Sequence, residues 1–351
     1  MSKSVSIARI RQMRGRVDFD EALPGRPVVS VSLWGTSFDD GDAWLLAAFP
    51  RLRRLWLTHT RIGDDGLAIL AGLTNLRELY LQATLISDDG LAHMRGLSRL
   101  RSLGLQMTDI GDAGLTHLQG LCRLRTLYLS TTGISDDGLG ILGRIPSLRS
   151  IGLAFTSVKD MGLGHLSGHP ELRSLNLYTT GVTDAGLAAI VMCPQISELG
   201  LAGTQISDDG LAHLGGFDRF RKLSLDKTRV GDVGLAHLAG LALLKQMELN
   251  DTLIGDTGLE HLEDCRRLDV LGLSRTQISD DGLAYLRKMH RLRILRLEGT
   301  RVGDAGLMRL KGLTRLQAIY ARGTAITADG ADELKRAIPG LDEIQFGPGN
   351  G

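Results

Sequence analysis

Histidines and aspartates are the side chains of this 351-residue chain that could bind a metal ion or transfer protons, and both recur at fixed intervals. The recurring histidines are His93, His117, His165, His213, His237 and His261. If each lies on one of a row of packed helices, neighbours are roughly 8–10 Å apart, whereas a zinc ion holds each imidazole at about 2.1 Å. We therefore predict half-exposed surface histidines and no metal site.

Aspartate recurs in the same series, at Asp64, Asp88, Asp112 and onward. Such carboxylates could bind calcium, but each lies where a helix is expected to begin. A side-chain oxygen at that point accepts hydrogen bonds from the free N–H groups of the first turn, and its charge meets the positive end of the helix dipole. We predict that these aspartates, Asp136 among them, are N-caps.

Motifs of catalysis and cofactor binding do not support an enzyme. The segment 138–143 has the glycine spacing of a dinucleotide-binding loop, but its glycines fall inside an expected helix, and the motif requires a position between a strand and a helix. The sequence contains no Walker A loop, His-Glu-x-x-His pair or nucleophile elbow. We predict no catalytic residue and no cofactor.

All of these residues belong to a repeat of 24 residues that is marked by one threonine. The threonines are Thr36, Thr60, Thr84, Thr108, Thr132, Thr156, Thr180, Thr204, Thr228, Thr252, Thr276, Thr300 and Thr324. Of the 13 repeats, 12 have Asp four residues after the threonine, Ala328 being the exception, and 12 have Gly six residues after it, Asp42 being the exception. An unbroken period of this length is typical of a solenoid, in which neighbouring repeats stack to bury their apolar side chains.

Each repeat is expected to contain a short strand followed by a short helix. Leu127 and Leu129 alternate with polar neighbours, which is the period of a half-buried strand. After Thr132, Leu139 and Leu142 follow helical offsets. Because strands stack about 4.8 Å apart and packed helices need roughly 8–10 Å, the helices must lie on the outside of an arc.

The resulting motif, Leu-x-x-Leu-x-Leu-x-x-Thr-x-Ile-x-Asp-x-Gly-Leu-x-x-Leu, resembles the leucine-rich repeat. It is closest to the cysteine-containing subclass and its bacterial relatives, with Thr in the position of Cys or Asn. The resemblance implies an α/β fold, a right-handed horseshoe solenoid with a parallel β-sheet on the concave face and short helices on the convex face. It also implies threonine hydroxyls that bond backbone groups between turns, and a protein that binds other proteins.

The extent of the repeat divides the chain into three segments. Residues 1–27 lack it and are expected to form a basic leader that caps the first repeat, although their basic start also leaves an organelle presequence open. Residues 28–346 are the repeat domain, and residues 347–351 are a flexible tail. We expect no secretory signal and no membrane anchor, and three cysteines without a disulfide framework predict a reducing compartment, the cytoplasm. We also expect a monomer.

The concave face should carry the partner-binding side chains, at positions six, four and two residues before each threonine. Early repeats have aromatic side chains there, which often anchor protein interfaces, although strand propensity and cross-strand stacking would also place them there. Late repeats have charged side chains. The candidate residues are Trp34, Trp56, Tyr80, Tyr128, Phe155, Tyr178, Glu248 and Arg296. We predict a non-enzymatic scaffold that binds a protein of unknown identity.

A net charge of +1 conceals a separation of charge, because 16 of the 41 basic residues lie seven or nine positions before the threonines. One rim of the sheet should therefore be basic. Its candidate polyanion-binding residues are Arg53, Arg77, Arg101, Arg125, Arg149 and Arg173. A solvated rim is the simpler interpretation, and the lack of interleaved aromatic residues disfavours nucleic acid. A third hypothesis, taken from F-box relatives of the subclass, is the substrate-recognition subunit of a ubiquitin ligase-like assembly.

Overall fold

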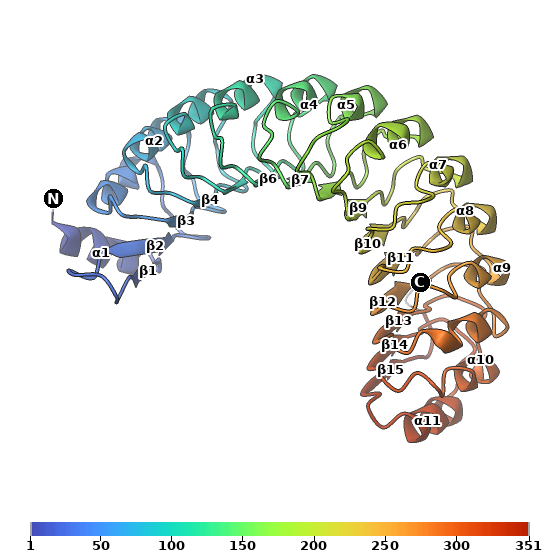
Figure 1. Cartoon of the computed structure of the whole chain (residues 1–351). Helices are drawn as coiled ribbons and strands as arrows, with labels where there is room; N and C mark the ends of the chain where they lie inside the picture. The colour runs from blue at the N-terminus through green and yellow to red at the C-terminus, as the bar shows by residue number, and fades with distance from the viewer. Residues whose placement is uncertain (1, 350–351) are drawn as a thin grey trace. The chain divides into compact units, whose positions relative to one another are not determined.

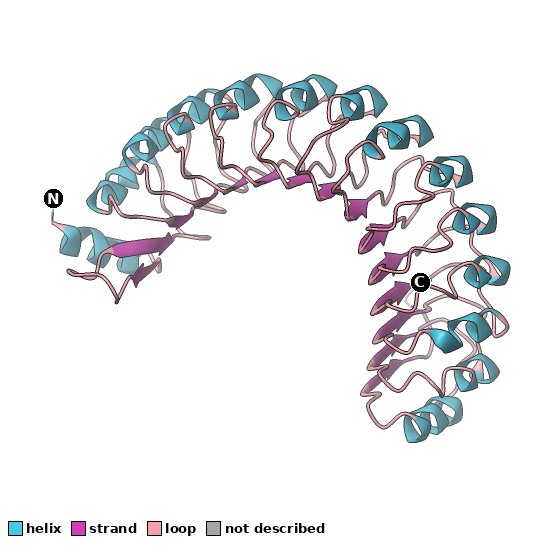
Figure 2. Cartoon of the chain, in the orientation of Figure 1, coloured by secondary structure: helices cyan, strands magenta, loops and turns pink. Residues whose placement is uncertain are grey.

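The computed structural model describes residues 2–349 and alternates one short strand with one short helix along the chain (Figures 1 and 2). Two compact units divide it, residues 1–173 and 174–351, which we call the first half and the second half. The first half contains α1 (Lys3–Gln12), β1 (Arg16–Phe19), β2 (Val28–Ser32), η1 (Asp40–Ala48), β3 (Arg54–Trp56), α2 (Asp64–Leu67), η2 (Ala68–Gly72), β4 (Glu78–Tyr80), η3 (Asp89–Met94), β5 (Ser102–Gly104), α3 (Asp112–Leu115), η4 (Thr116–Leu118), β6 (Thr126–Tyr128), α4 (Asp136–Leu142), β7 (Ser150–Gly152) and α5 (Asp160–Gly164), where η denotes a 3-10 helix.

The second half continues the alternation. It contains β8 (Ser174–Asn176), α6 (Asp184–Ile190), β9 (Glu198–Gly200), α7 (Asp208–Ala212), β10 (Lys222–Ser224), α8 (Asp232–Ala236), β11 (Gln246–Glu248), α9 (Asp256–Glu260), β12 (Val270–Gly272), η5 (Gly282–Lys288), β13 (Ile294–Arg296), α10 (Asp304–Met308), β14 (Ala318–Tyr320), α11 (Ala328–Ala337) and β15 (Glu343–Gln345).

Strands within each half pair in parallel and in register. Leu55 of β3 faces Leu79 of β4, 24 residues later, and the same spacing recurs from strand to strand. In each half the strands follow the inner side of a curve and the helices its outer side (Figure 2). The predicted α/β solenoid, with a parallel sheet on the concave side and short helices on the convex side, is confirmed.

The first strand departs from the parallel sheet. β1 pairs antiparallel with β2, with Val17 opposite Val31, because a short loop joins them and short loops connect antiparallel neighbours. Ile10 of α1 is fully buried. At the other end of the chain, residues 350–351 of the predicted tail lie outside the described residues.

The core lies between the strand layer and the helix layer. Leu57 and Leu81, just after β3 and β4, are fully buried, as are Leu67 and Leu70 on the helical side. These aliphatic side chains repeat from turn to turn, so each turn covers the apolar face of the preceding one. None of the helices among residues 2–349 has the length and the apolar character needed to cross a membrane.

The repeated threonine acts within its own turn. The Oγ1 of Thr60 donates to the carbonyl oxygen of Leu57 at 2.6 Å, and that of Thr204 donates to Leu201 at 2.5 Å. The prediction that these hydroxyls bond backbone groups between turns is therefore wrong. A hydroxyl only one bond from Cβ reaches the carbonyl of its own tight turn, three residues back.

The repeated aspartate makes the bond between turns instead. Asp136 is the first residue of α4, whose N-cap is Ser135, and its Oδ1 accepts from the backbone N–H of Lys159 at 2.7 Å. Asp64 accepts from the N–H of Ser87 at 2.8 Å and from its hydroxyl at 2.6 Å. The N-cap prediction is wrong, because the carboxylate points toward the following repeat and not along its own helix.

Candidate partner-binding surfaces

The strand face of the first half carries a stacked pair of aromatic rings. Trp56 on β3 and Tyr80 on β4 are direct cross-strand partners, with ring centroids 5.9 Å apart and an interplanar angle of 11°. The guanidinium of Arg54 lies 5.9 Å from the Trp56 ring centroid. Trp34, two residues beyond β2, is 67% exposed. These three rings present apolar surface on adjacent strands.

Glycine on the next strand makes room for the tyrosine rings. A Cβ added to Gly104 would meet the Tyr80 ring at 2.9 Å, and one added to Gly152 would meet the Tyr128 ring at 3.4 Å. Each ring therefore lies across the neighbouring strand, with one side packed on backbone and the residue half-buried. Each tyrosine side chain is thus packed on one side and exposed on the other. Burial raises the pKa of Tyr80.

Phe155 lies apart from this group. It is 61% exposed and occupies the turn before Thr156 with φ of 57°. The residue before every repeated threonine has positive φ, and nine of the 13 are not glycine. Its exposure therefore comes from the turn at the end of the strand and not from strand alternation.

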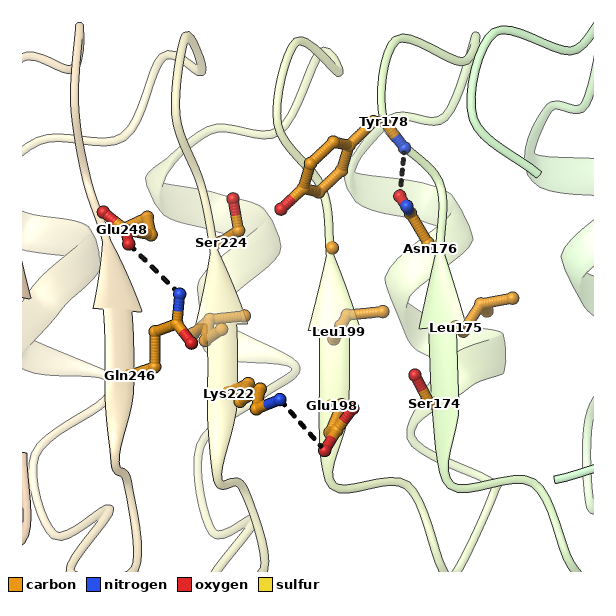
Figure 3. A pocket seen from close by; sticks show the side chains of 12 residues that line it. Ser174, Leu175, Asn176, Tyr178, Glu198, Leu199, Lys222, Ser224, Gln246 and Glu248 are labelled. Atoms are coloured by element: carbon orange, nitrogen blue, oxygen red, sulfur yellow. Dashed lines mark hydrogen bonds and ion pairs between the residues drawn. The ribbon is translucent and has the colours of Figure 1, made fainter. Parts of the chain in front are cut away.

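The strand face of the second half has a polar pocket of about 150 Å³ (Figure 3). The lining residues are Ser174, Leu175, Asn176, Tyr178, Glu198, Leu199, Gly200, Lys222, Leu223, Ser224, Gln246 and Glu248. Tyr178 leans from the end of β8 across β9 toward Ser224 on β10 (Figure 3), since Gly200 leaves the space that a Cβ would fill. Burial raises the pKa of Tyr178.

One hydroxyl in this pocket has unused hydrogen-bonding capacity. Ser224 is 7% exposed, and its Oγ makes no close hydrogen bond; the Tyr178 hydroxyl is directed toward it and interacts with it weakly (Figure 3). Lys222 and Glu198, at the same pocket, form an ion pair at 3.7 Å. The pocket therefore offers a desolvated hydroxyl beside paired charges, which favours a polar group over an apolar one.

Beside the pocket, Glu248 and Arg296 form an ion pair across β12. Arg296 Nη1 lies 2.6 Å from Glu248 Oε1, and Gly272 on β12 leaves room for the carboxylate between them. Glu248 is 9% exposed and also accepts from Asn250 Nδ2 at 3.2 Å. Because these contacts hold the Glu248 carboxylate in place, it orients the Arg296 side chain. Arg296 is the member of the ion pair that is more exposed to solvent.

A half-buried aspartate completes this polar cluster. Asp226 Oδ1 accepts from the backbone N–H of Asn250 at 2.8 Å and from its side chain at 3.0 Å. Burial raises the pKa of Asp226, and the charge of Glu248 adds to the effect. The sequence analysis did not predict that these residues lie together. Glycines in neighbouring strands, such as Gly200 and Gly272, could have indicated it, because side chains of adjacent strands fill the space that a Cβ would occupy.

The candidate rim arginines are not all equivalent. Arg53 pairs with Asp20 at 3.2 Å, and Arg149 pairs with Glu171 at 3.1 Å. Arg77, Arg101, Arg125 and Arg173 are exposed.

The six recurring histidines are exposed or half-buried on the helical side.

Comparison with solved structures identifies the fold of the chain. No protein-family model matches the sequence of the chain, and no curated protein matches it. Solved structures do match, and they are leucine-rich-repeat proteins: the chain has the leucine-rich-repeat fold, as the motif indicated.

Two bacterial structures are the relevant neighbours. One is an internalin from Listeria monocytogenes, 20% identical, with 99% of this chain and 95% of that chain covered and a TM-score of 0.59. The other is a leucine-rich-repeat protein from Leptospira interrogans, 14% identical, with 86% of each chain covered and a TM-score of 0.54. At such identities the likeness concerns the fold.

Proposed function

We propose that this protein is a non-enzymatic scaffold, active as a monomer, that binds another protein through its inner strand surfaces. The observation that carries the proposal is the stacked pair of Trp56 and Tyr80 beside the exposed Trp34. Rigid aromatic side chains bury much area on binding at little entropic cost, and they dominate the affinity of many interfaces. No residue among residues 2–349 covers the Trp34 ring, so we propose that a bound partner covers it.

The second half contributes a different kind of contact. A polar side chain of the partner that enters the pocket at Ser224 would give this hydroxyl a closer hydrogen bond than it has in the pocket, and Arg296 would meet an acidic group at the surface. Hydrogen bonds made in a desolvated pocket select a partner more sharply than apolar contact does. The aromatic face would therefore supply affinity and the polar pocket specificity.

The hypothesis of a ubiquitin-ligase subunit has less support. Within residues 2–27, α1 and β1 pack on the first repeat, and no separate domain for a ubiquitin ligase is formed there. We place the protein in a reducing compartment, the cytoplasm, on the strength of Cys122 and Cys265, which are free thiols.

Two matched tryptophans test the proposal. Trp56→Ala removes the stacked ring from the strand face, and Trp44→Ala removes a 41% exposed ring from the helical side of the same half. Each variant and the parent would be used to capture partners from the native source, with quantitative mass spectrometry. We expect a partner whose affinity falls by about 2 kcal/mol with Trp56→Ala and stays unchanged with Trp44→Ala.

The reverse pattern would contradict the proposal, as would equal capture by all three proteins. Urea unfolding of both variants serves as the control. If Trp56→Ala lowers the free energy of unfolding by more than about 3 kcal/mol, the ring belongs to the core and not to a binding surface.

A further inference from the structure

Among residues 2–349, six arginines of the basic rim of the first half form no ion pair: Arg51 and a group of five that follows it. The five are Arg77, Arg99, Arg101, Arg123 and Arg125. Three of them occupy one register position on successive strands. The backbone N–H of Arg101 donates to the carbonyl of Arg77 at 2.7 Å, and that of Arg125 donates to Arg101 at 2.9 Å. Their side chains therefore leave the sheet about 4.8 Å apart.

The three arginines of this register lie between two paired ones. Arg53 precedes them in the same register and pairs with Asp20, while Arg149 follows them and pairs with Glu171. In this register the arginine on either side of Arg77, Arg101 and Arg125 is thus paired with an acid.

Two adjacent hollows lie between these arginines. The first, of about 290 Å³, is lined by Arg77, Ser98, Arg99, Arg101, Cys122 and Arg123. The second, of about 390 Å³, is lined by Arg101, Cys122, Arg123, Arg125, Ser147, Arg149 and Glu171. They share Arg101, Cys122 and Arg123, and the only acidic side chain in either lining, Glu171, is already paired. Both hollows are therefore positive.

One of the arginines is held in place without losing its charge. Asn75 Oδ1 accepts from Arg99 Nη1 at 2.6 Å, and the Asn75 amide donates to the carbonyl of Pro50 at 2.9 Å. A neutral amide orders the guanidinium, whereas a carboxylate would neutralise it. Order of this kind lowers the entropic cost of binding an anion.

We propose that the two hollows bind two neighbouring phosphate groups of an oligophosphate. A guanidinium fork binds two oxygens, and four arginines around one hollow offer more donors than the two oxygens of a carboxylate can use. A phosphate group has enough oxygens to meet several forks at once. No aromatic side chain lines either hollow, so a nucleobase would not be stacked, and recognition rests on phosphate alone.

Binding of inorganic tripolyphosphate tests the proposal directly. Isothermal titration would compare the parent with a variant in which Arg77, Arg101, Arg123 and Arg125 are changed to Gln. The matched control changes Lys245, Arg267, Arg291 and Arg315 to Gln, which removes the same charge from the rim of the second half, at positions seven or nine residues before a threonine. We expect the first variant to bind at least about tenfold more weakly and the control to bind like the parent.

Equal loss in the control, or no binding by the parent, overturns the site. An oligoglutamate that binds as tightly as tripolyphosphate overturns the choice of phosphate. Displacement by a short oligothymidylate, with the same arginine dependence, would identify a phosphodiester source, and its failure would leave an oligophosphate or phosphomonoester.

Cys122 provides an independent readout of location, because it is exposed and lines both hollows. Cys193 and Cys265 are buried, and burial raises the pKa of the Cys265 thiol to about 12, so alkylation by iodoacetamide should be selective for Cys122. Mass spectrometry would follow the modification with tripolyphosphate and with chloride of equal ionic strength. Slower modification with tripolyphosphate is expected. Unchanged modification under saturating tripolyphosphate would place the anion elsewhere and contradict the proposal.

Discussion

The Oδ1 atom of Asp64 occupies the space where Gly90, in the next repeat, would carry a Cβ. The same relationship joins Asp208 to Gly234 in the second half. Each aspartate reaches forward to bond the next turn, and the next turn must have glycine to admit it. The two recurring residue types are therefore one structural device, shared between consecutive repeats.

Both exceptions to the repeat fit this relationship. Asp42 stands in place of the glycine in the first repeat, which has no earlier repeat to send a carboxylate into it. Ala328 stands in place of the aspartate in the last of the 13 repeats. Both deviations thus fall at the ends of the series of repeats.

We predict that Gly90→Ala destabilises the protein by about 1–3 kcal/mol, because the added methyl overlaps the Asp64 carboxylate and the Leu67 side chain. Urea unfolding measures the change. Gly96→Ala is the control, since a Cβ there meets no atom within 4 Å, and it should leave stability unchanged or raise it by about 0.5–1 kcal/mol. If the two substitutions changed the free energy of unfolding equally, the pairing of aspartate and glycine between consecutive repeats would be contradicted.

The threonine bond gives a smaller prediction. Thr204→Val removes the hydroxyl that donates to Leu201, but that carbonyl keeps its bond from the Thr204 backbone N–H at 3.2 Å. We expect a loss of about 1 kcal/mol. Thr204→Ser retains the hydroxyl and should lose less. A serine variant that is less stable than the valine variant would show that the methyl group, and not the hydroxyl, is what matters.

Asp226 should make stability fall as pH rises. Its folded-state pKa lies above the ordinary aspartate value of about 3.9 because of burial, so its favourable contribution is complete below about pH 4 and is lost through the raised pKa. Asp226→Asn keeps an acceptor for Asn250 and removes the charge. We expect the variant to be more stable than the parent near neutral pH and equal to it in acid, as measured by urea unfolding across pH.

Asp251 is the control of opposite sign. Its hydrogen bond with Arg275 lowers the pKa of the carboxyl, so this pair stabilises the fold above about pH 4 and the contribution is lost as pH falls through the lowered pKa. Asp251→Asn should therefore weaken the protein at neutral pH. A pH-independent effect of either variant would disagree with the cause given for its shift.

The unpaired rim arginines should repel one another in the absence of a ligand. Changing Arg77, Arg101, Arg123 and Arg125 to Gln is expected to raise the free energy of unfolding by up to about 1 kcal/mol at low salt, with the gain reduced near 0.15 M salt by screening. Thermal unfolding at several salt concentrations measures this. A variant less stable than the parent at low salt would mean that these side chains pack against the rim.

The sequence by itself determined the repeat, the strands, the helices and the core. Alternating leucines before Thr132 and helically spaced leucines after it can be buried in only one way when identical copies stack, so Leu127 and Leu139 were predictable from local spacing. The preference of parallel strands and packed helices for different separations then curves each half.

Only the tertiary structure decided which neighbour each polar side chain meets. Asp136 could cap its own helix or bond Lys159, and sequence spacing does not distinguish these partners, because the distance to the next repeat is set by how the turns stack. The ring of Tyr178 reaches across Gly200 toward Ser224, and Arg149 pairs with Glu171 while Arg125 has no ion pair within residues 2–349. Such partners lie about one or two repeats apart along the chain and only one or two strand spacings apart in space, and it is the stacking of whole turns that converts the first distance into the second.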